Sequence, residues 1–106
     1  MTIRYKNAKT KLTTTNATAV LTPDNATTAV IKSILVSEDS GNADTITLTI
    51  TAGSDVFSLF KVKAVSANGT VELLSAPLVL AESEILKATA ATANRLHVVV
   101  SFMEIS

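Results

Sequence analysis

Residues 44–52, with the sequence DTITLTITA, alternate almost perfectly between apolar and hydroxyl-bearing side chains. Successive side chains of an extended strand point to opposite faces of a sheet, so the isoleucines and leucine share one face and the threonines the other. Threonine is β-branched and stiff about χ1, which favours a pleated sheet over a helix. The segment is therefore predicted to be a strand with one buried face and one hydroxyl-lined face.

Similar short segments recur along the chain and are separated by turn residues. We expect further strands over residues 17–22, 27–37, 56–66 (one long strand or two short ones), 70–74, 78–80, 85–91 and 95–105. Asn68-Gly69 predicts a tight hairpin, because both residues tolerate a positive φ angle. Turn signals at such short intervals are typical of a sandwich or a jelly roll. The predicted fold is all-β: a single-domain antiparallel β-sandwich, jelly-roll-like or immunoglobulin-like, with about eight short strands and no substantial helix.

Size and composition narrow the functional classes. The 106 residues suit one domain. The chain has no cysteine, which excludes disulfides and thiolate metal sites. Nine basic and nine acidic residues give no net charge, whereas a nucleic-acid-binding protein normally has a basic excess. No apolar run approaches the roughly 18 residues that a membrane span needs, so neither nucleic acid nor membrane is an expected partner.

The first sixteen residues differ from the rest. Arg4, Lys6, Lys9 and Lys11 supply four of the nine positive charges, and no acidic residue precedes Asp24. We interpret residues 1–16 as a basic arm or edge strand that lies on a neighbouring molecule or on its own sheet; the alternative is a solvated terminus. Residues 17–106 are then expected to form the sandwich.

Candidate reactive groups are few. His97 is the only histidine, and a lone histidine without a second ligand is seldom a metal site. Glu38, Asp39, Asn42 and Asp44 crowd one loop and could offer oxygens to calcium, but their spacing also fits ordinary turn chemistry.

Glu82 and Glu84 could act as paired carboxylates, although they flank Ser83 in a predicted turn, where a solvated loop is the simpler interpretation. We expect no catalytic residues, no metal site and no cofactor, and hence not an enzyme.

Several strand and turn segments resemble small β-sandwich virion proteins of tailed bacteriophages. The matching segments are SILVS at 33–37, ANG at 67–69, LLSAPLVL at 73–80, EILKATA at 84–90 and VVVSFMEI at 98–105. The resemblance covers about residues 18–105. Its usual Gly-Asp turn is Ser83-Glu84 here, and residues 1–16 lie outside it.

This resemblance implies a structural protein of the virion, made in the host bacterial cytoplasm. Such domains serve as capsid decoration (cement) proteins, or alternatively in a collar, tail or fibre. The implied partners are the major capsid protein or other virion proteins, together with further copies of the chain in a homo-oligomer, of which we favour a trimer. The expected attachment residues lie in the N-terminal segment: Ile3, Arg4, Tyr5, Lys6, Lys9 and Lys11.

A third possibility is a carbohydrate-binding module for host adsorption, which would need exposed aromatic side chains. The only candidates are Tyr5, Phe57, Phe60 and Phe102, and we expect Phe57 and Phe102 to be core residues because they lie in apolar strands.

Overall fold

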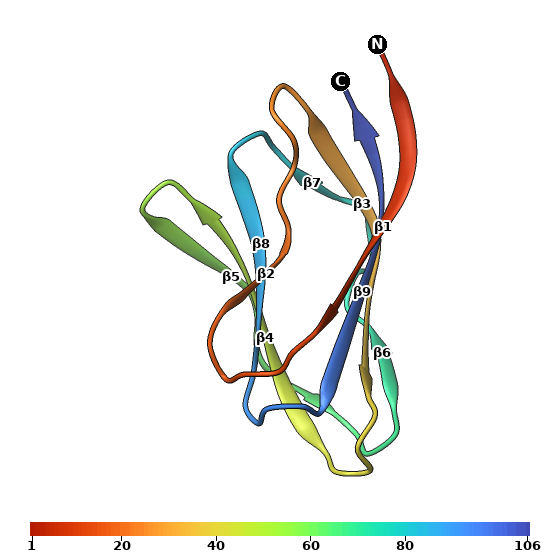
Figure 1. The fold of residues 1–106 in the computed structure, drawn as a ribbon, viewed down its shortest axis with the longest axis vertical. Coiled ribbons are helices and arrows are strands. Elements are labelled where there is room, and N and C mark those ends of the chain that lie inside the picture. The colour runs from red at the N-terminus through yellow and green to blue at the C-terminus, as the bar shows by residue number, and fades with distance from the viewer.

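The computed structural model describes residues 1–106 as nine strands without a helix, so the predicted all-β class is confirmed (Figure 1). The strands are β1 (Ile3–Lys11), β2 (Thr18–Leu21), β3 (Thr28–Glu38), β4 (Asp44–Ala52), β5 (Asp55–Val65), β6 (Thr70–Glu72), β7 (Leu78–Leu80), β8 (Glu84–Ala90) and β9 (Leu96–Ile105).

Two antiparallel sheets pack face to face. Sheet A has the order β1-β9-β3-β6, with β7 also paired to β3, and sheet B has the order β2-β8-β4-β5. Figure 1 shows sheet A on the right and sheet B on the left. Each strand of the first half pairs with one of the second half in a nested series, β1 with β9, β2 with β8, β3 with β7 and β6, and β4 with β5. This nesting is the connectivity of a jelly roll.

The strands β6 and β7 together take the place of one strand that runs antiparallel to β3. Both pair with β3, β7 along Ala29–Ile31 and β6 along Leu35–Ser37. The interruption contains Pro77, which lacks the N–H that a continuous ladder requires. β3 has a register shift between Ile31 and Ser33 when it pairs with β9. The break between β6 and β7 therefore lies opposite the irregular part of β3.

The predicted Asn68-Gly69 hairpin is wrong. Asn68 does adopt a positive φ of 55°, but the strands on either side belong to different sheets, β5 to sheet B and β6 to sheet A. The turn therefore carries the chain across the sandwich. This turn favours glycine at position 69, because a Cβ atom would clash with Ser66 Oγ and would lie 3.1 Å from the Ser66 carbonyl oxygen.

The inner faces of the two sheets form one apolar core of small and medium side chains. The alternation of β4 is realised as predicted, with Ile46 and Leu48 fully buried and the threonines half-buried on the outer face. From sheet A, Ile34, Val98 and Val100 meet this layer. Twenty buried residues belong to the cluster, which gives a single core for the whole chain.

Residues 3–11 form an edge strand and not a detached arm. β1 pairs along its whole length with β9, and Leu12, the next residue, is only 1% exposed within the core. Counting β1 as a strand raises the total from the expected eight or so to nine. The N-terminal segment is therefore part of the sandwich.

Phe102 is a core residue as expected, but the expectation for Phe57 is wrong, because its side chain is 56% exposed. Phe57 pairs with Ile50 and so shares its face of sheet B. β5 is the edge strand of that sheet, and the β4–β5 hairpin projects away from sheet A in Figure 1. The tip of the hairpin consequently has no opposing layer.

Candidate interaction surface

The outer edge of β1 has free backbone hydrogen-bonding groups. Thr2 and Ser106 donate N–H to each other's carbonyl oxygens, and Leu12 donates to the Leu96 carbonyl, all at 2.9 Å. In an antiparallel ladder the hydrogen-bonded pairs alternate with non-bonded pairs, so the even-numbered residues of β1 bond to β9. The N–H and C=O groups of the odd-numbered residues from Ile3 to Lys11 therefore point away from β9, at the edge of the sheet.

The six predicted attachment residues divide between the two faces of β1. Because directly opposed residues share a face, the register places the side chains of Ile3, Tyr5, Lys9 and Lys11 on the outer face of sheet A. Arg4 and Lys6 lie on the inner face, opposite Glu104 and Phe102. Lys6 Nζ forms an ion pair with the buried carboxylate of Glu104 at 3.1 Å. Lys6 is thus partly committed to holding β1 on β9.

An apolar band crosses the outer face of sheet A at the end where the termini lie. One row runs across four strands, from Tyr5 through Met103 and Val30 to Val79. The neighbouring row contains Ile3, Ile105 and Thr28. Tyr5 is 80% exposed, Val79 57% and Ile3 47%. We call these two rows the apolar band; neither contains a charged side chain.

Of this band, only Ile3 and Tyr5 are among the attachment residues predicted from the sequence. Val30, Val79, Met103 and Ile105 lie in strands that the sequence predicts, but the sequence gives no sign that they share one exposed face. The available signal was the apolar character of both faces in residues 95–105. It became interpretable only when the register placed these residues opposite those of β1 and β3.

A shallow pocket of about 300 Å³ lies at the other end of the β1–β9 pair, lined by Lys9, Lys11, His97 and their neighbours. His97 is half-buried and lies opposite Lys11 on one side and Ser37 on the other. The histidine therefore belongs to the outer face of sheet A, beside two exposed lysines. This is a basic environment suited to an anionic group.

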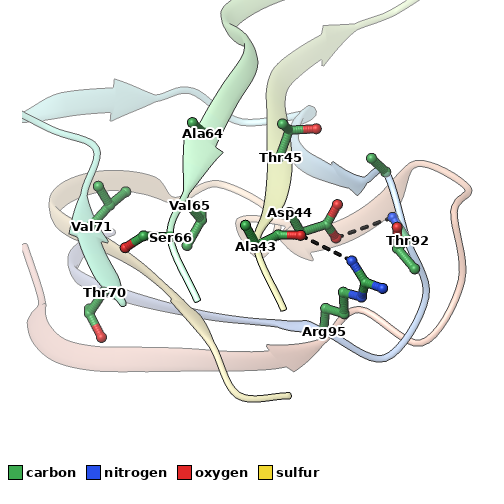
Figure 2. Close-up of a pocket in the computed structure, with 11 residues that line it drawn as sticks. Ala43, Asp44, Thr45, Ala64, Val65, Ser66, Thr70, Val71, Thr92 and Arg95 are labelled. Carbon is green, nitrogen blue, oxygen red and sulfur yellow. Dashed lines mark hydrogen bonds between the residues drawn. The ribbon is translucent and has the colours of Figure 1, made fainter. Parts of the chain in front are cut away.

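A larger pocket, of about 530 Å³, opens between β4, β5, β6 and the loop before β9 (Figure 2). Its charged groups are engaged within the fold: Asp44 Oδ2 accepts a hydrogen bond from the Thr92 N–H at 3.1 Å, and Arg95 donates to the Ala43 carbonyl at 3.0 Å. The remaining lining consists of alanine, valine, threonine and serine side chains. The polar groups thus tie the β8–β9 loop to the start of β4.

Glu38, a candidate calcium ligand, has a different role. Its carboxylate accepts hydrogen bonds from the backbone N–H groups of Ser40, Gly41, Asn42 and Asn68, at 2.7 to 3.0 Å. Burial raises the pKa of Glu38, but the Ser40 hydroxyl and these amides outweigh it and lower the pKa from 4.5 to about 2. The carboxylate joins the β3–β4 loop to the turn at Asn68.

The other members of that loop do not converge with Glu38 on one point. Asp44 bonds to Thr92, and the Asn42 amide contacts Ser40. Asp39 is exposed. No group of three or more histidine, aspartate or glutamate side chains in the chain is arranged to hold a metal ion.

Two further glutamates also bind backbone amides. Glu72 accepts hydrogen bonds from the Ser33 hydroxyl and from the Ile34 N–H at 2.8 Å, at the irregular point of β3. Burial raises its pKa, but these hydrogen bonds lower it below the ordinary value. Glu84 accepts from the Ala81 N–H at 2.8 Å, while Glu82 is exposed in the same turn. Glu82 therefore lies in the turn, Glu84 binds the turn from the first position of β8, and Ser83 between them takes a φ of 72°.

No protein-family model and no curated protein matches the chain. The structure also contains no long apolar helix of the kind that crosses a bilayer. The function must therefore be inferred from the surfaces described above.

Proposed function

We propose that this chain is a structural protein of a bacteriophage virion, a capsid decoration protein that binds the head shell as a homo-oligomer. The sequence resemblance over residues 18–105 suggests the virion, and the jelly-roll connectivity is in keeping with it, since this architecture recurs in viral capsid domains, although lectins share it.

The observation that carries the proposal is the apolar band. A cluster of exposed apolar side chains on the face of a sheet costs free energy in water and commonly marks a protein–protein contact. Because its two rows have no charge, the band suits contact with an uncharged surface on another copy of the chain better than contact with a charged partner. We assign this band to the association of copies and the basic edge of β1 to the shell.

Quantitative mass spectrometry of purified phage particles tests the proposal. A decoration protein is expected at on the order of hundreds of copies per particle, because it follows the symmetry of the shell. A dozen copies or fewer would instead support the collar, tail or fibre alternative. Absence from the particle would overturn both.

The carbohydrate-binding alternative depends on exposed aromatic side chains. Tyr5 and Phe57 are both exposed, but they belong to β1 and β5, which are edge strands of different sheets. β1 lies near β2, whereas β5 lies beside β3, so the two strands are at opposite sides of the sandwich. The two rings do not form one platform for a sugar, and we therefore favour the structural role.

A further inference from the structure

The edge strand β1 combines open backbone groups with charge of one sign. Arg4, Lys6, Lys9 and Lys11 all lie on it, and it contains no acidic residue. Only Lys6 has a carboxylate partner, Glu104. Arg4, Lys9 and Lys11 are exposed. The edge therefore presents both hydrogen-bonding groups and uncompensated positive charge.

These charges discriminate between the strands that could pair with this edge. Lysines on an edge strand disfavour pairing with a like strand. A second copy of β1 would bring its own four cations beside the first four, which is unfavourable in either direction of pairing. An acidic strand would instead place carboxylates beside these four basic residues, where opposite charges attract. The pocket lined by Lys9, Lys11 and His97 can accept a further anionic group of the partner at the end of the same edge.

We propose that the open edge of β1 binds an extended acidic segment of a partner protein, which adds to sheet A as a new outer strand. The backbone groups of Ile3, Tyr5, Asn7, Lys9 and Lys11 form the ladder, and the basic side chains select for acidic residues. The inference rests on the proposed function only in naming the shell protein as the source of the segment.

Calorimetry with a designed peptide tests the binding. In antiparallel register with residues 11 to 3, acetyl-ETEVTEVEV-amide places glutamates opposite Lys11, Lys9, Lys6 and Arg4. We expect binding that weakens with added salt, because much of the attraction is between exposed charges. The control peptide acetyl-KTKVTKVKV-amide should not bind.

A pair of variants at Asn7 tests strand addition itself. The Asn7 N–H points away from β9, so Asn7→Pro removes an outward donor and leaves the ladder to β9 intact. Asn7→Ala keeps the donor and serves as the matched control. We expect Asn7→Pro to weaken peptide binding about two- to tenfold, as the loss of one edge hydrogen bond implies, while Asn7→Ala binds like the wild type. Thermal unfolding checks that both variants are folded.

Amide hydrogen exchange measured by NMR completes the test. The bound peptide should slow exchange at Tyr5, Asn7 and Lys9. Peptide binding without this protection, equal binding by the two Asn7 variants, or no binding would overturn the inference. Copy number in the particle is measured independently, so failure of the virion assignment and failure of strand addition are distinguishable.

Discussion

At the scale of single residues, carboxylates in this protein bind backbone amides in turns and irregular strands. Glu38, Glu72 and Glu84 all do so. The sequence showed a cluster of oxygen-bearing side chains around Glu38, which is compatible with calcium or with turn formation. Only the positions of Ser40 and Asn68 decide between these interpretations, and Asn68 is thirty residues away along the chain.

Glu38→Gln tests this role. The folded-state pKa of Glu38 is about 2, below its ordinary value of 4.5, so folding favours the ionised form. Its contribution to stability is present above about pH 4.5 and is lost as the pH falls toward 2. We expect the variant to melt at a lower temperature than the wild type at pH 7, and the difference to shrink across that acid range in a thermal unfolding series.

The exposed Glu82→Gln is the matched control and should leave the melting temperature nearly unchanged. A difference between wild type and Glu38→Gln that stays constant from pH 7 to pH 2 would show that ionised Glu38 does not hold the two loops together.

At the scale of elements, strands whose two faces differ were predicted well, whereas for β1 the sequence left an arm and an edge strand both open. The Thr/Ile alternation of β4 predicts both its extent and its buried face. β1 has no such alternation, because most of its side chains are exposed on both faces. Its place is set by pairing with β9, more than eighty residues away along the chain. Similarly, nothing local shows that the turn at Asn68 joins different sheets.

Leu12→Ala tests whether the N-terminal segment belongs to the fold. Leu12 is 1% exposed in the core, directly after β1. Truncation of a buried leucine leaves a cavity, so we expect a loss of about 2 to 5 kcal/mol in the free energy of unfolding, measured with urea. The neighbouring Lys11→Ala, at an exposed position, should change it by less than about 0.5 kcal/mol. Equal stability of the two variants would mean that the segment is dispensable.

At the scale of the whole molecule, the two sheets have outer faces of different character. The outer face of sheet B carries the half-buried threonines of β4, whereas that of sheet A carries the apolar band. The sequence predicted an oligomer with attachment through residues 3–11, but it did not separate the surface for copies from the surface for a partner. The separation that we propose depends on which residues share a row across β1, β9, β3 and β7.

The most direct test of the apolar band is the mass of the isolated chain in solution, measured by gel filtration with light scattering. We predict an oligomer, with the trimer favoured, for the wild type and for Thr49→Lys, which adds a charge to the outer face of sheet B. Met103→Lys adds the same charge to the centre of the apolar band and should give a monomer. A monomeric wild type, or a Met103→Lys variant that stays oligomeric, would contradict the account.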